Sequence, residues 1–335
     1  MNTSILHSTR LLVLALVAVA AVALVAFALG SRSPARSVGA GDAGTPAVDD
    51  IPPPPPGFPP PGPEIKAAAA IDGLLARGGR HLDEKEHELA AEVFERAMDD
   101  SRKTGDHGRL VRSALGRTEA LASLGREPEA LELAASMRRG RPAGPPTTEA
   151  LRLAALESAL LHAAGRPLEA APVAREALDD ADRYASGDSD LRGLLVSALA
   201  DALAAAEGFA DAARLIDEHL ARPEVSGRLS PGMRAEWLDR AGRLHGAAGD
   251  FDLSVARLES SLDARAEAGG DDPLLAAVTR ISLAASLFDA GLPDRARAEA
   301  VKAHAVLSPE LPPDHPERKR LAAIAARIGA ELTAP

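Results

Sequence analysis

The chain has 335 residues, of which 46% are hydrophobic and only 2% aromatic, and its formal net charge is −11 at pH 7. This negative charge, without a compact basic face in the sequence, argues against nucleic acid as a partner. Because the chain contains no cysteine, it has no disulfide, thiolate metal site, cysteine nucleophile or lipidated cysteine. A folded core must be built mostly from Ala, Leu and Val.

The amino-terminal stretch is typical of a membrane anchor. Residues 1–10 are a polar leader, and the nineteen residues from Leu11 to Leu29 carry no charge. That length suffices for one membrane span and exceeds the usual hydrophobic region of a cleaved signal. We therefore predict a transmembrane anchor at residues 11–30. The alternative is cleavage at Ala26-Phe27-Ala28, which would leave a secreted or periplasmic protein.

The orientation follows from the lengths on either side of the predicted span. A short leader before a large carboxy-terminal domain favours export of that domain, so we expect it on the periplasmic side of the membrane. Residues 31–63 are rich in Pro, Gly and Ala and are predicted to be a disordered linker. The proline runs favour an extended polyproline helix, so the thirteen residues Ile51–Pro63 would span roughly 40 Å. We interpret them as a spacer; a ligand for a proline-recognising groove is the alternative.

A repeat organises residues 64–335. Small residues recur with spacings of 40, 40, 42, 42 and 42 at Ala90, Ala130, Ala170, Ala212, Ser254 and Ala296. A second column of small residues stands twelve positions before each of these, at Gly78, Thr118, Ser158, Ala200, Gly242 and Ala284. A period of this length indicates a repeat array. Because each period is long enough for two helices, we predict six helical hairpins whose helices approach closely at the small residues.

Turn residues and apolar spacing give the predicted helix pairs. They lie near residues 67–100, 109–138, 148–182, 189–221, 231–266 and 273–306, with the longer loops between the pairs. A final helix, Glu317–Leu332, places Arg318, Lys319, Arg320 and Arg327 beside apolar residues. This pattern is typical of the half-unit with a charged outer face that caps such an array.

The segment from Gly249 to Leu258 resembles the turn and second helix of a tetratricopeptide repeat, as do Leu89–Met98 and Gly208–Ala213. The usual unit of that family has 34 residues. The longer unit here, and Pro313-Asp314-His315-Pro316 before the last helix, resemble the kinesin-light-chain-like subclass. The resemblance covers about residues 67–332 and implies an all-α, right-handed α-solenoid. Arrays of that subclass often carry inner-face asparagines, whereas the only asparagine here is Asn2.

No catalytic, cofactor-binding or metal site is predicted, and we expect that the chain is not an enzyme. The one local cluster of potential ligands combines His81 and His87 with Asp83, Glu84, Glu86 and Glu88. We interpret it as a solvated connection between two helices. The adjacent carboxylates Asp271 and Asp272 are interpreted as a helix start, because carboxylates stabilise the amino-terminal end of a helix.

A binding surface is expected on the concave side, which the first helix of each hairpin lines. By helical phase from the small columns, the inward set is Arg112, Glu119, Arg152, His162, Asp201, Glu236, Asp239, Arg243 and Phe288. Such mixed charges could hold an extended peptide or a partner helix. The alternative is a solvated groove with no dedicated ligand. Trp237, the only tryptophan, is predicted to pack between helices.

These features predict a membrane-tethered scaffold that mediates protein–protein interaction at a cell envelope. Its expected partners are a protein or peptide in the groove and the membrane at Leu11–Leu29. The alternative is a non-catalytic accessory or assembly subunit that regulates an envelope enzyme complex.

Overall fold

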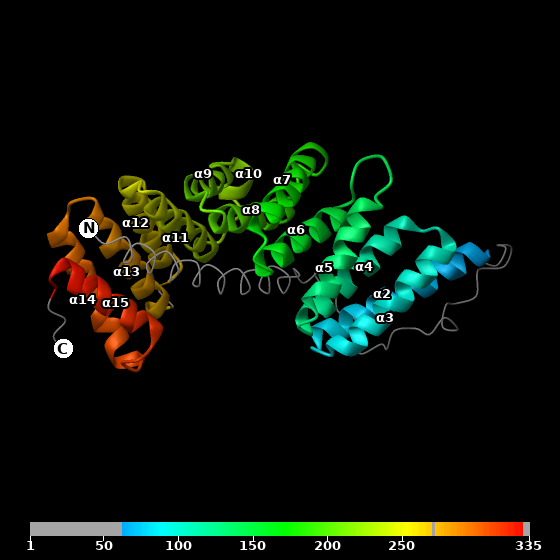
Figure 1. Ribbon diagram of the computed structural model, residues 1–335, viewed down its shortest axis with the longest axis horizontal. Coiled ribbons are helices and arrows are strands. Elements are labelled where there is room, and N and C mark those ends of the chain that lie inside the picture. The colour runs from blue at the N-terminus through cyan, green and yellow to red at the C-terminus, as the bar shows by residue number, and fades with distance from the viewer. Residues whose placement is uncertain (1–61, 270–271, 331–335) are drawn as a thin grey trace. The chain divides into compact units, whose positions relative to one another are not determined.

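The computed structural model describes residues 62–269 and 272–330 and is helical throughout these ranges (Figure 1). They contain fourteen helices, α2 to α15, and no strand, which confirms the predicted all-helical, solenoid-like fold. The predicted membrane anchor at residues 11–30 and the linker up to residue 61 lie outside the described residues. Among the described helices, none combines the length and the apolar character that a membrane span requires.

The chain divides into two compact units, which meet in sequence at Ala202 and Leu203. The first unit contains successive pairs of helices, each joined by a short turn. These are α2 (Pro63–Asp83), α3 (His87–Thr104), α4 (His107–Ser123), α5 (Glu127–Arg139), α6 (Thr148–Ala163) and α7 (Pro167–Tyr184). The next helix, α8 (Ser189–Ala205), continues across the boundary between the units.

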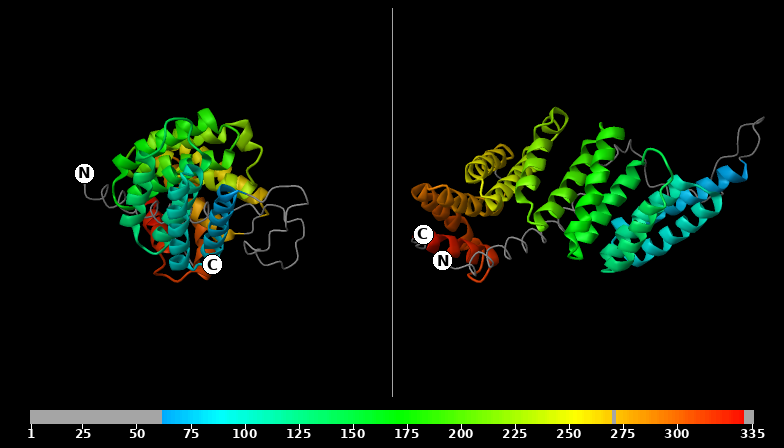
Figure 2. Two further views of the ribbon diagram at one scale, coloured as in Figure 1. Left: turned by 90° about the vertical axis from the view of Figure 1, so that its right-hand side faces the viewer. Right: turned by 45° about the horizontal axis from the view of Figure 1, so that its top comes forward.

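The second unit repeats this arrangement and ends with a single helix. Its helices are α9 (Phe209–Leu220), α10 (Pro223–Ser226), α11 (Pro231–Ala248), α12 (Phe251–Glu267), α13 (Pro273–Asp289), α14 (Pro293–Glu310) and α15 (Pro316–Ile328). Helices α11 and α12 pack side by side, as the right-hand view of Figure 2 shows for the yellow pair. The observed helices match the predicted pairs to within a few residues.

The two columns of small residues are buried where the helices of a hairpin meet. All twelve of these residues are buried. Two hydrogen bonds join the columns directly: the Ser158 hydroxyl donates to the Ala170 carbonyl oxygen at 3.0 Å, and the Ser254 hydroxyl to that of Gly242 at 2.7 Å. The close approach that the repeat predicts is therefore confirmed.

Glycine in the first column makes room for the few large side chains of the core. A Cβ added at Gly78 would lie 2.8 Å from the Phe94 ring, and one at Gly116 only 2.4 Å from it. In the second unit, a Cβ at Gly242 would lie 2.6 Å from Cγ of Leu258. The rest of the core is mainly Ala, Leu, Val and Ile, as the composition predicts.

The structure corrects the predicted boundaries in two places. The predicted loop at residues 222–231 contains the short helix α10, which starts at Pro223 because the fixed φ of proline suits a first helical position. Its Val225 is only 2% exposed. The cap helix was expected to run to Leu332, but α15 ends at Gly329, whose φ of 64° is a left-handed conformation that glycine adopts without strain.

Candidate functional site

In the first unit, two of the predicted inward residues offer charge at the surface of neighbouring first helices. Arg112 on α4 is 55% exposed and donates from Nη2 to Glu149 Oε1 of α6 at 3.2 Å. Arg152 on α6 is exposed and makes no ion pair within the described residues. Two adjacent hairpins thus contribute to one polar surface.

The other predicted residues of the first unit are less accessible. Glu119 and His162 are partly buried, and Asp201 is only 7% exposed. The Nδ1 atom of His162 is buried without a hydrogen-bond partner among the described residues. Helical phase placed these side chains on the right helices, but it could not show how closely the next hairpin covers them.

In the second unit, Asp239 and Arg243 belong to a buried polar cluster between α11 and α13. Asp239 is 6% exposed. Its carboxylate accepts a hydrogen bond from Thr279 Oγ1 at 2.9 Å and pairs with Arg243 Nη2 at 2.8 Å. The exposed Glu236 lies one turn earlier on α11. Most of the carboxylate's bonding capacity is therefore used inside the unit.

The cap helix α15 adds Arg320 to this cluster, which the sequence did not predict. Arg320 Nη2 donates to Ser282 Oγ of α13 at 2.8 Å, and its Nη1 lies 3.6 Å from Glu317 Oε2. Burial lowers the pKa of the Arg320 guanidinium below its ordinary value. The expectation that Arg320 lies on a charged outer face is thus wrong, because α15 turns this side chain towards α13.

The same cap helix occupies the surface around Phe288. This residue is partly buried, and the Arg327 guanidinium lies over its ring, 5.2 Å from the centroid. Arg327 also pairs with Asp289. Phe288 is therefore engaged inside the unit. The sequence signal that could have identified this contact is a pair of Arg residues, Arg320 and Arg327, spaced seven positions apart and hence on one helix face.

A second polar network joins α9, α11 and α12. Asp217 accepts hydrogen bonds from His245 Nε2 at 2.9 Å and from Arg257 Nε at 2.7 Å. Burial alone would raise the pKa of Asp217, but the hydrogen bonds from Arg257 and His245 outweigh it and hold that pKa below its ordinary value. All three groups are tied to one another, so the network stabilises the hairpin stack.

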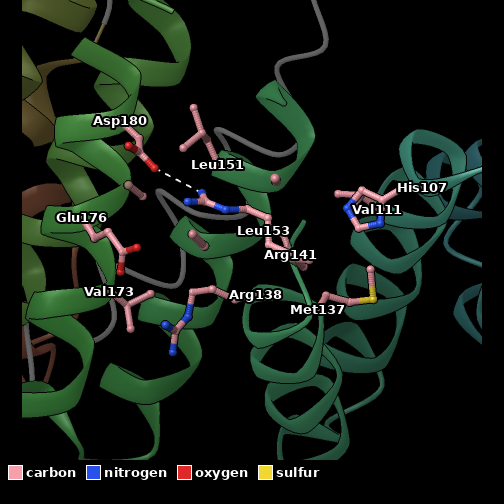
Figure 3. A pocket seen from close by; sticks show the side chains of 13 residues that line it. His107, Val111, Met137, Arg138, Arg141, Leu151, Leu153, Val173, Glu176 and Asp180 are labelled. Atoms are coloured by element: carbon pink, nitrogen blue, oxygen red, sulfur yellow. Dashed lines mark hydrogen bonds and ion pairs between the residues drawn. The ribbon is translucent and has the colours of Figure 1, made fainter. Parts of the chain in front are cut away.

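The structure places a hollow in the first unit, between α4, α5, α6 and α7 (Figure 3). It encloses about 30 Å³, room for about one water molecule, and the space amounts to about 480 Å³ when its open mouth is counted. Val111, Leu151 and Val173 give it an apolar lining. Charged side chains surround the mouth, and Figure 3 shows Arg141 directed at Asp180, whose carboxylate lies 3.1 Å away.

The predicted solvated connection between α2 and α3 brings three potential ligands together. His81 Nδ1 lies 2.6 Å from Glu86 Oε2 and 4.0 Å from Glu84 Oε2. Both glutamates are exposed. A histidine that hydrogen-bonds an exposed carboxylate fits a turn in water, and this contact does not define a metal centre.

Comparison with known proteins supports the repeat fold and adds no chemistry. No family model and no curated protein matches the chain. Among solved structures, BtubC (BKLC) from P. vanneervenii is similar at 19% identity, with a TM-score of 0.51 over 79% of this chain and 95% of that one. Aspartyl phosphate phosphatase F from Bacillus subtilis is similar at 12% identity, with a TM-score of 0.50 over 79% of this chain and 71% of that one.

These likenesses concern the fold alone. Together with the repeat columns, they show a tetratricopeptide-like helical repeat protein.

Proposed function

We propose that the chain is a membrane-tethered scaffold that binds protein partners at a cell envelope. The observation that carries the proposal is the surface of α4 and α6, where neighbouring hairpins present Arg112, Glu149 and Arg152 together. Stacked hairpins gather side chains from several repeats into one extended surface, which suits a peptide or a partner helix. The uncharged run Leu11–Leu29 supports the tether.

The test compares two charge reversals in the full chain. Arg152 is exposed on the first helix α6, and Arg175 is exposed on the second helix α7 of the same hairpin. We expect Arg152→Glu to abolish co-purification of a specific partner from membranes, because it reverses charge on the proposed surface. Arg175→Glu is the matched control and should leave the partner bound. If both variants retain the same partner, the proposed surface is wrong.

The alternative function is an accessory or assembly subunit of an envelope enzyme complex. The same surface would serve it, because binding is the shared step. The two functions separate once a partner is isolated: an accessory subunit changes the catalytic rate of that partner when the purified chain is added, whereas a scaffold leaves the rate unchanged.

A further inference from the structure

Two second helices of the repeat are shorter than the others. Helix α5 has 13 residues and α9 has 12, whereas α3, α7 and α14 have 18 and α12 has 17. A shortened second helix leaves the far end of its hairpin uncovered, because no side chains follow it there. The two units treat this uncovered end differently.

In the second unit, the chain itself supplies the missing cover. Helix α10 follows α9, contacts it, and buries Val225 to 2% exposure. The ring of Trp237 lies 5.0 Å from the ring of His219, centroid to centroid. In the repeat register, His219 stands seven residues after Ala212, and Trp237 stands five residues before Gly242.

In the first unit, the corresponding residues are smaller and the cover is missing. Met137 stands seven residues after Ala130, and Leu153 stands five residues before Ser158, so they match His219 and Trp237. The connection that follows α5, residues 140–147, contains three prolines and two glycines and buries none of its residues. The hollow of Figure 3 lies at this end of the hairpin, with Met137 and Leu153 in its lining.

We propose that this hollow is a docking site for a partner protein, which inserts one aliphatic side chain carried on a short basic segment. The second unit shows what such a segment looks like when the chain provides it. Val225 is the buried aliphatic residue, and Arg222 and Arg228 flank it. An apolar pocket that receives one anchoring side chain is a common way to fix a partner.

The charges around the mouth select a basic segment. Arg138 is held by the buried Glu157 at 2.8 Å, and Arg141 is held by Asp180. Glu176 is exposed and makes no ion pair within the described residues, so the mouth carries an uncompensated carboxylate. The chain's own Asp49-Asp50-Ile51 would bring two more carboxylates to it. Charge complementarity therefore favours an external basic segment over this part of the linker.

A peptide with the sequence of residues 221–230 and blocked ends is the probe. The full chain is labelled with ¹³C at its methionine methyl groups, which gives few signals because it contains only four methionines. Met137 lines the hollow, Met98 is fully buried elsewhere in the first unit, and Met233 lies in the second unit. We expect a saturable shift of the Met137 signal with millimolar peptide, while the signals of Met98 and Met233 stay in place. Met137→Leu assigns the signal.

Matched changes on both sides decide the outcome. A peptide with Val225→Asp should bind at least about tenfold more weakly, because a charged group cannot enter an apolar hollow. Ala150→Leu in the protein fills the hollow from within and should abolish the shift, and an unchanged Met98 signal shows that this variant is folded. Glu176→Gln should weaken binding about two- to fivefold.

An unmoved Met137 signal, or equal binding of both peptides, would overturn the proposal. This site is separate from the surface of α4 and α6 around Arg152, so its failure leaves the proposed scaffold function standing, and the reverse also holds.

Discussion

Gly242 shows how one missing side chain sets the distance between two helices. A Cβ there would lie 2.6 Å from Cγ of Leu258, whereas a Cβ at Gly73, within α2, would meet nothing within 4 Å. We therefore expect opposite effects of the same substitution. Gly242→Ala should lower the free energy of unfolding by about 1–3 kcal/mol through overpacking. Gly73→Ala should raise it by up to about 1 kcal/mol through helix propensity.

Urea unfolding of the full chain measures both variants. If the two substitutions shift the unfolding free energy in the same direction, the close approach at Gly242 is not what constrains this position.

Asp217 makes the stability of the second unit depend on pH. Its pKa in the folded state lies below its ordinary value, because hydrogen bonds from Arg257 and His245 outweigh burial. The charged carboxylate therefore stabilises the fold above the unfolded pKa of about 3.9, and this contribution is lost as the pH falls through the folded pKa. Asp217→Asn should cost about 1–3 kcal/mol near neutral pH.

The difference in unfolding free energy between wild type and Asp217→Asn should shrink below about pH 4. Asp211→Asn is the control, because Asp211 is 58% exposed and its pair with Arg214 contributes little. Unfolding free energies measured across the acidic range check this. A difference that is constant with pH would mean that the network does not stabilise the charged form.

Among single residues, the small columns could be predicted and the polar partners could not. Period and residue size were enough for Ala170 and Ser158, because close packing depends on volume alone. Asp239 was placed on the right helix, but its partners Thr279 and Arg243 depend on the lateral spacing of α11 and α13. That spacing is set by the whole stack and is not written in one helix.

The cap helix α15 closes the apolar end of the second unit. Leu321 is 1% exposed and belongs to the same core cluster as Leu307 and Ile328. Leu321→Ala should lower the free energy of unfolding by about 2–5 kcal/mol, because it leaves a cavity. Lys319→Ala on the exposed side should change it by less than about 0.5 kcal/mol. Thermal unfolding measures both; equal melting temperatures would mean that α15 does not cap the core.

Helix bounds were predicted closely wherever a helix was long enough to show its period. The four-residue helix α10 was missed because it is barely one turn long, so its apolar residues cannot repeat. The hollow in the first unit was missed for a related reason. It results from a comparison between α5 and α9, and apolar spacing within either helix does not report what covers its end.

For the chain as a whole, the membrane anchor at Leu11–Leu29 remains a prediction that fractionation can test. The full chain should sediment with membranes and stay there in high salt, which releases proteins held by surface charge alone. A chain that begins at Gly62 should stay in the supernatant, because it lacks the uncharged run. If the array is exported, protease added outside spheroplasts should cleave the linker.

Release of the full chain by salt would rule out a membrane-spanning anchor. Cleavage of the linker only after lysis would place the repeat array on the cytoplasmic side, and a mature protein that starts near Leu29 would indicate a cleaved signal.

The single tryptophan gives the molecule a built-in optical probe for one of its two units. Trp237 lies in the second unit, between the His219 ring at 5.0 Å and the Arg240 guanidinium at 5.8 Å. Its emission therefore reports the loss of structure around α9 and α11 and is blind to the first unit. Circular dichroism sees helices of both units. Coincident melting curves from the two signals would show that the units unfold together, and separated curves would show that each has its own transition.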